Sequence, residues 1–247
     1  MTAMTYDGAG ARRGAPDDEI GAGPLSRGAA VVWWVLTVSG LTVLTGGLPL
    51  AVVPLLLSDP SNAPLVALAA VPLAPALAAA VFAWRRFLGD RDLGPGRHFW
   101  RGYRLNALDV LRWWVPTVAV LAVVGFTAGN LGQARVPAGY GVVLAVVAAA
   151  LLLWAANALV LSATLSLRTR DVARLAAYYL AARPLVTLGT LSLLVLCVGV
   201  VVLTSDWVLV ALLGPFALAL TRNAAPVLRD ATARFTRPTD HGRGPHA

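Results

Sequence analysis

Long uncharged runs constrain this chain more than any other feature of its sequence. About 20 residues of helix cross a hydrocarbon core of roughly 30 Å, because a helix rises about 1.5 Å per residue. Uncharged runs cover residues 29–57, 61–84, 113–133 and 136–167, and the run 184–221 holds a single charge, Asp206. Only 13% of all residues are charged, against about a quarter in a soluble domain. These runs predict several membrane-spanning helices.

The run 184–221 is too long for one span. As a single helix it would measure about 57 Å, and Asp206 near the bilayer centre would cost about 2.5–3.5 kcal/mol. A hairpin turning at Ser205–Asp206 removes both problems, and further turns are predicted at 58–62 and 132–139. The fold class is therefore predicted as all-α, a polytopic membrane helical bundle. Its six spans are expected at 30–50, 64–86, 113–131, 141–166, 185–204 and 207–221, of which the sixth is the shortest.

The arginines divide unequally between the two sides of such a bundle. All 20 basic residues are arginines, and only Arg135 falls in the loops that follow spans one, three and five. By the positive-inside rule, this predicts both termini in the cytoplasm. The predicted organisation is a disordered N-terminal segment (1–28), a six-helix transmembrane domain (29–223) with an arginine-rich cytoplasmic loop (85–112), and a C-terminal tail (224–247).

Residues 97–114, RHFWRGYRLNALDVLRWW, combine arginines and aromatics at helical spacing. One stripe holds four arginines and Leu108, and the other holds Phe99, Tyr103, Ala107, Val110 and Trp114. This amphipathic pattern predicts either an anchor at anionic headgroups, with Trp113 and Trp114 in the aromatic belt, or a docking surface for a cytoplasmic partner. Nucleic acid is disfavoured, because no basic fold of a recognised type accompanies it. The candidate docking residues are Phe99, Arg101, Tyr103, Arg104, Asn106, Arg112 and Trp113.

Arg168, Arg170 and Arg174 repeat the basic theme more weakly, and are ascribed to topology. No catalytic, metal or cofactor residue is predicted, because the three histidines (His98, His241, His246) form no metal-ligand spacing and no phosphate-binding loop or nucleophile elbow occurs. The chain is therefore expected not to be an enzyme.

The single Cys197 is expected to act as a small hydrophobe. It could form a disulfide only with another chain, and the sequence leaves a homo-oligomer open.

Two features inside the spans admit a functional or a structural interpretation. Glycines and prolines interrupt the first hairpin (Gly46, Gly47, Pro49, Pro54, Pro64, Pro72 and Pro75), and such breaks either line a transporter site or only kink helices. Asn157 is expected to hydrogen-bond a neighbouring helix rather than a substrate. No acidic residue lies in a predicted span, which counts against an ion-coupled carrier.

Several short motifs, in order, resemble the YesL-like family of bacterial multi-pass membrane proteins. They are Gly23-Pro24-Leu25, Leu48-Pro49, the small-residue stretch 72–87, Phe99-x-x-x-Tyr103-Arg104-x-Asn106, and the hairpin segments 183–194 and 212–220. The resemblance covers about residues 23–235, although the stretch 49–72 is longer than expected of the family and Gly40 stands where a polar residue is expected.

This resemblance implies a six-span plasma-membrane protein associated with carbohydrate uptake. We therefore expect a non-enzymatic accessory or scaffold whose partners are the lipid bilayer, its anionic headgroups and the subunits of an ABC importer. The alternative is a small solute transporter or channel subunit. The chain lacks the EAA-G cytoplasmic loop of an importer permease, so it is not expected to be the permease itself.

Overall fold

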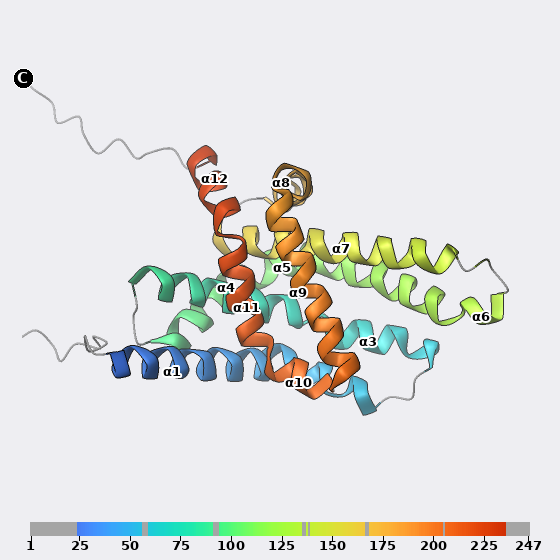
Figure 1. Cartoon of the computed structure of the whole chain (residues 1–247), viewed down its shortest axis with the longest axis horizontal. Helices are drawn as coiled ribbons and strands as arrows, with labels where there is room; N and C mark the ends of the chain where they lie inside the picture. The colour runs from blue at the N-terminus through green and yellow to red at the C-terminus, as the bar shows by residue number, and fades with distance from the viewer. Residues whose placement is uncertain are drawn as a thin grey trace, which may run out of the picture.

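The computed structural model describes residues 24–55, 59–90, 94–134, 137, 139–165, 168–204 and 206–235, and within them every regular element is helical (Figure 1). The first half contains α1 (Pro24–Thr42), the π-helical turn η1 (Val43–Gly47), α2 (Leu48–Leu50), the 3-10 turns η2 (Val53–Leu55) and η3 (Pro60–Asn62), α3 (Ala63–Ala70) and α4 (Leu73–Asp90). The second half contains α5 (Pro95–Gly129), α6 (Leu131–Ala134), α7 (Gly139–Thr164), α8 (Thr169–Ala182), α9 (Pro184–Leu203), α10 (Asp206–Ala211), α11 (Leu213–Asn223) and α12 (Ala225–Phe235). The all-α prediction is confirmed.

Five helical segments are long and apolar enough to cross a membrane: Gly28–Leu50, Ala63–Gly89, Pro95–Gly129, Gly139–Thr164 and Pro184–Leu203. They overlap the first five predicted spans, although the third segment begins at Pro95, well before the predicted start at residue 113. The sixth predicted span differs, because a turn at Leu212 divides it into α10 and α11. Pro215 contributes to this break, since it has no N–H to bond the carbonyl four residues earlier. The predicted hairpin is present, with α11 returning beside α9 (Figure 1).

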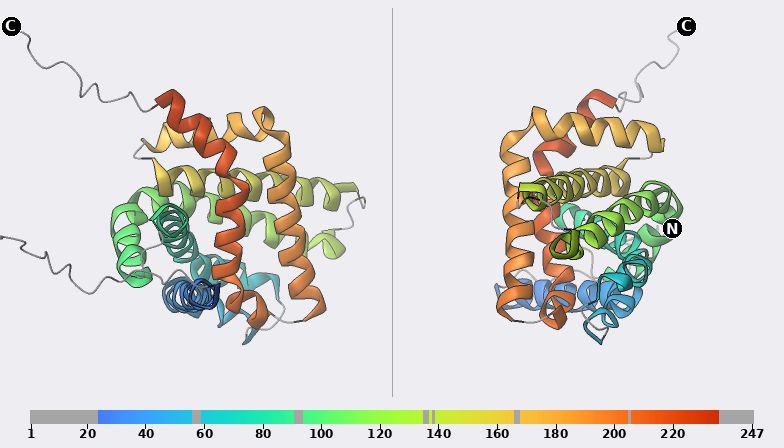
Figure 2. Two further views of the ribbon diagram at one scale, coloured as in Figure 1. Left: turned by 60° about the vertical axis from the view of Figure 1, so that its left-hand side comes forward. Right: turned by 90° about the vertical axis from the view of Figure 1, so that its right-hand side faces the viewer.

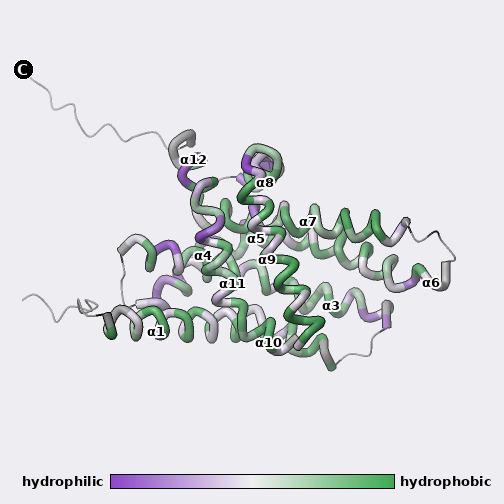
Figure 3. Tube along the Cα trace, viewed as in Figure 1, coloured by the Kyte–Doolittle hydropathy of each residue, from purple (hydrophilic) through white to green (hydrophobic). Residues whose placement is uncertain are grey.

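The helices run in two main directions. In Figure 1, α9 and α11 stand upright, whereas α1 and α7 lie across them, and α9 and α11 remain upright in both views of Figure 2. Apolar residues dominate α7 and α9, while hydrophilic segments gather at α8 and where α4 meets α5 (Figure 3). In the apolar stretch of α9 only 11% of residues are buried by the rest of the chain. Such exposed apolar helices are characteristic of a multi-pass membrane protein.

The predicted arginine-rich segment 85–112 is mostly helix, as the helical spacing of residues 97–114 predicted, and it holds the ends of two helices. Helix α4 continues to Asp90, and α5 begins at Pro95 and runs without interruption into the third span. Pro95 suits the first turn of a helix because its fixed φ is already helical and no N–H is needed there. The described arginines of this segment therefore sit on two helix ends, Arg85 and Arg86 on α4 and the other four on the first half of α5.

The two predicted end segments are also partly ordered. Residues 24–28, assigned above to a disordered segment, form the first turn of α1, and residues 1–23 lie outside the described part of the chain. The predicted tail begins with α12, which buries Val227, Leu228 and Ala231. The tail from residue 236 onward, with His241 and His246, lies outside the described residues. One side of α12 is therefore part of the packed core.

An aromatic cluster ties the first half of the chain to α5. Trp34 of α1 lies 5.9 Å from Trp84 and 4.7 Å from Phe87, both of α4, and stacks on His98 of α5 at 6.3 Å between ring centroids. Trp34 and Trp84 are completely buried. The Trp84 indole N–H also donates to the Gly214 carbonyl at 3.2 Å, which joins α4 to α11.

Glycines allow the closest helix approaches. A Cβ on Gly214 would overlap the Ser39 side chain of α1, and a Cβ on Gly102 would lie 2.8 Å from Phe82 Cβ of α4. Small residues at such crossings let two backbones pack directly against each other, which is the usual way that membrane helices associate.

The two interrupted helices of the first hairpin pack against each other at their breaks. Gly46 in η1 faces the break between α3 and α4, where a Cβ on it would lie 3.1 Å from the Pro72 carbonyl oxygen and 2.6 Å from Ala76 Cβ.

In the predicted turn between the first two spans, the carboxylate of Asp59 accepts a hydrogen bond from the Ser61 N–H at 2.8 Å. Hydrogen bonds from Ser61 hold the pKa of Asp59 below its usual value.

Candidate docking surface and adjoining pocket

The exposed side of the first half of α5 forms the candidate docking surface, which we call the α5 arginine face. Its exposed members are Arg97, Trp100, Arg101, Arg104, Leu105, Leu108 and Arg112. The predicted stripe of four arginines with Leu108 in its gap is thus confirmed as one exposed face. Among the described residues, Arg101 and Arg104 form no salt bridge, so their charge is available to an anionic group.

The predicted apolar stripe lies on the opposite side of α5 and is packed inside the protein. Phe99 is fully buried, and Tyr103 is half-buried with its ring stacked on Phe99 at 6.5 Å. Gly102 lies against Phe82, so α4 covers this stripe. The stripe therefore contacts protein rather than the headgroup layer expected from the sequence.

Trp113 and Trp114 are also buried, being only 4% and 8% exposed. The expectation that they belong to a lipid-facing aromatic belt is therefore wrong. Trp114 donates its indole N–H to the Ala70 carbonyl at 2.9 Å, at the end of α3. The sequence alone does not distinguish a tryptophan at the lipid–water boundary from one buried between helices. In both places the ring needs an apolar surface and the N–H needs a hydrogen-bond acceptor. Of the seven candidate residues, Phe99 and Trp113 cannot reach a partner from these positions.

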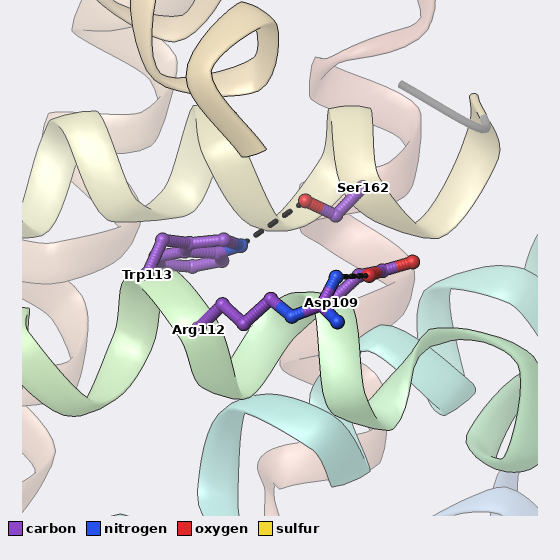
Figure 4. Close-up of polar contacts among 4 residues, drawn as sticks. All are labelled: Asp109, Arg112, Trp113 and Ser162. Carbon is purple, nitrogen blue, oxygen red and sulfur yellow. Dashed lines mark hydrogen bonds and ion pairs between the residues drawn. The ribbon is translucent and has the colours of Figure 1, made fainter. Parts of the chain in front are cut away.

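Trp113 instead joins three helices. Its indole N–H donates to Ser162 Oγ of α7 at 3.2 Å (Figure 4), and its ring meets Trp154 edge-on at 5.7 Å. Trp154 in turn donates its own indole N–H to the Ala173 carbonyl of α8 at 3.0 Å. The pair fixes α5, α7 and α8 relative to one another, and so holds the α5 arginine face in place.

Asn106 and Arg112, the remaining predicted residues, make local contacts on α5. Asn106 Nδ2 donates to the Gly102 carbonyl at 2.9 Å, one turn earlier. Arg112 forms an ion pair with Asp109 at 2.8 Å (Figure 4), and both side chains are more than half exposed. Exposed pairs of this kind contribute about 0.2–1 kcal/mol. Arg112 is therefore partly neutralised, whereas Arg101 and Arg104 are not.

A pocket of about 290 Å³ opens beside this face, between α4, α5, α7 and α8. Its polar lining residues are Asn106, Asp109, Ser162, Thr164 and Thr169, together with the indole of Trp113. Thr164 donates its hydroxyl hydrogen to the Val160 carbonyl, and Asp109 is paired with Arg112. The pocket thus offers mainly hydrogen-bond acceptors and an aromatic wall. Within the described residues, no three His, Cys, Asp or Glu side chains lie close enough to hold a metal ion.

Polar contacts join α8, and the arginine that follows it, to α12. Tyr179 of α8 donates its hydroxyl to Asp230 of α12 at 2.9 Å, and Arg183 approaches the same carboxylate at 3.4 Å. The basic residues predicted from topology (Arg168, Arg170 and Arg174) are exposed on and beside α8. Segments predicted to share one side of the membrane are therefore neighbours in space.

The main interhelical amide is one that sequence reasoning missed. Asn223 of α11 donates to the Val186 carbonyl and to Thr190 Oγ1 of α9, whereas buried Asn157 makes no hydrogen bond within the described part of the chain. Asn223 closely follows an arginine at a predicted span end, and such a position is usually interpreted as solvated. Gly189, opposite it, is the one available signal, because a side chain there would overlap the Asn223 amide.

Comparison with known proteins adds no relative to this description: no protein-family model, no curated protein and no solved structure matches the chain.

Proposed function

We propose that this protein is a non-enzymatic accessory or scaffold of the plasma membrane that binds a cytoplasmic partner through the α5 arginine face. The observation that carries the proposal is the exposure of Arg101 and Arg104 without a salt bridge among the described residues, on a helix whose other side is packed against α4. Arginine and tryptophan, which both occur on this face, are enriched among the residues that dominate protein interfaces.

The adjacent apolar residues favour a protein partner over a simple headgroup anchor. Trp100, Leu105 and Leu108 are 44%, 59% and 72% exposed, and they alternate with the arginines on one continuous surface. A partner with an acidic rim and apolar centre would complement this pattern. The resemblance to the YesL-like family makes the subunits of a sugar ABC importer the partner class to test first, with the protein acting as an accessory to carbohydrate uptake.

Charge reversal tests this proposal. The variant Arg101→Glu/Arg104→Glu and a matched control, Arg170→Glu/Arg174→Glu, would be purified from native membranes in mild detergent, and the co-purifying proteins quantified by mass spectrometry. We expect the α5 variant to lose the partner at least tenfold, and the α8 control to retain it. Equal retention by both variants would contradict docking through this face.

The second candidate function is a small solute transporter or channel subunit. It is favoured by the contact between the two helix breaks at Gly46 and Pro72, since transporter sites are often built where discontinuous helices meet. Flux of a panel of sugars and metabolites into proteoliposomes would test it. Flux that Gly46→Val abolishes while Gly199→Val preserves it would favour this second function, and an absence of flux would count against it.

A further inference from the structure

We propose that a second cavity, between α4 and α11–α12, binds the phosphate group of an anionic phospholipid through Arg85 and Arg229. The cavity measures about 640 Å³, and its walls include both arginines, Leu88, Leu228, Thr221 and Thr232. This inference is independent of docking through the α5 arginine face, because neither arginine belongs to that face.

The charge of this cavity is uncompensated. No Asp or Glu lines it, and neither Arg85 nor Arg229 forms an ion pair within the described residues. Guanidinium groups stay protonated in proteins, so positive charges from separate helices face one cavity. An anion that enters would be attracted by both charges.

The donors in the cavity select the kind of anion. Thr221 and Thr232 already donate their hydroxyl hydrogens to the carbonyls of Ala217 and Leu228 in their own helices. The arginines therefore supply the free donors, and the planar guanidinium fork matches two oxygens of a phosphate. The donors therefore suit an anion that presents two oxygens, a phosphate or a carboxylate, rather than a single-point acceptor.

The position of the cavity favours a phospholipid as the source of that anion. Arg85 lies near the end of the candidate span Ala63–Gly89, where an apolar helix meets the polar edge of a bilayer. Leu88, which is 46% exposed, lies beside it in the cavity wall, and Leu228 contributes a second apolar surface. An apolar wall next to paired guanidinium groups suits a glycerophosphate headgroup with its acyl chains attached.

Lipid retention by the full-length protein tests this inference. Wild type, Arg85→Gln, Arg229→Gln and the control Arg222→Gln would be reconstituted in nanodiscs of phosphatidylcholine containing phosphatidylglycerol, then released into detergent for native mass spectrometry. Arg222 is exposed on α11 and does not line this cavity. We expect wild type and control to retain phosphatidylglycerol over phosphatidylcholine, and each cavity variant to bind it roughly tenfold more weakly. Equal retention by all four proteins, or no preference for the anionic lipid, would overturn the proposal.

Two further arms identify the source and guard against misfolding. Arg85→Lys keeps the charge but not the fork, so it should restore part of the retention that Arg85→Gln loses. Inorganic phosphate would be titrated onto the protein in pure phosphatidylcholine discs. Phosphate binding that depends on Arg85 and Arg229, without any retained phosphatidylglycerol, would overturn the lipid assignment in favour of a soluble phosphate.

Discussion

Asn223 of α11 and Thr190 of α9 are joined across the C-terminal hairpin by a hydrogen bond of 3.0 Å from the amide to the hydroxyl oxygen. The Thr190 hydroxyl donates a hydrogen bond to the Val186 carbonyl. The same carbonyl accepts a second hydrogen bond from the Asn223 amide nitrogen at 2.9 Å. The Asn223 amide nitrogen and the Thr190 hydroxyl are thus both hydrogen-bonded, in a place where Thr190 is 2% exposed. The contact fixes the register of α9 against α11.

Removing this amide should loosen the hairpin. We expect Asn223→Ala to lower the free energy of unfolding by about 1–3 kcal/mol, because a buried acceptor loses its donor. Unfolding in a graded mixture of denaturing and mild detergent would measure the change. The matched control is Asn130→Ala, since Asn130 bonds only its own helix at Phe126. Equal losses in the two variants would show that the interhelical bond adds nothing.

Filling the crossing of α1 and α11 should be more damaging than an ordinary glycine substitution. A methyl group on Gly214 would overlap Ser39, so Gly214→Ala should destabilise the protein by about 1–3 kcal/mol. Gly199→Ala in α9 is the control, because nothing lies within 4 Å of its added Cβ and alanine favours a helix. The prediction fails if both variants have the same unfolding midpoint.

Two tryptophans of α5 should separate structural from docking roles. Trp113→Phe removes the bond to Ser162 and should cost about 0.5–1.5 kcal/mol of stability, yet it should leave co-purification of the partner unchanged. Trp100→Ala should have the opposite profile, since Trp100 is 44% exposed on the α5 arginine face. Loss of the partner in Trp113→Phe at full stability would return Trp113 to the docking set.

Reporter fusions should reveal the proposed membrane orientation. The positive-inside rule places a reporter fused after Asp59 or Arg135 outside the cell, and one fused after Asp92 or Asp171 in the cytoplasm. Paired phosphatase and fluorescent-protein fusions at each position would measure this. A reversal at any one position would break the six-span arrangement, even though five helical segments long and apolar enough to cross a membrane are present.

The sequence predicted the helical fold and the positions of five long apolar helices well because both follow from local properties. Apolar length decides which segments can cross a membrane, and the arginine spacing correctly identified one face of α5. It could not distinguish an aromatic that faces lipid from one that faces protein, so Phe99, Trp113 and Trp114 were assigned to the surface. Their burial depends on α4 and α7, which are distant in the chain, and no local pattern reports it.

The packing of the interrupted helices is a second feature that the local sequence pattern did not predict. The glycines at 46 and 47 signalled a break, but only the structure reveals that the break meets Pro72 and Ala76. The same holds for Asn223 and for the Arg85–Arg229 cavity, whose residues come from opposite halves of the sequence. Features that require two distant segments depend on tertiary packing, which periodicity does not encode.

The bond from Trp84 to the Gly214 carbonyl has a consequence for how the chain is made. Its two residues are separated by 130 positions, so α1 and α4 leave the ribosome long before α11 exists. During that interval the indole of Trp84 and the side chain of Ser39 lack the helix that covers them. The last hairpin is therefore needed to cover the surface of α1 and α4 around Ser39 and Trp84. A nascent chain truncated before residue 213 should leave this surface exposed to chaperones and quality-control proteases.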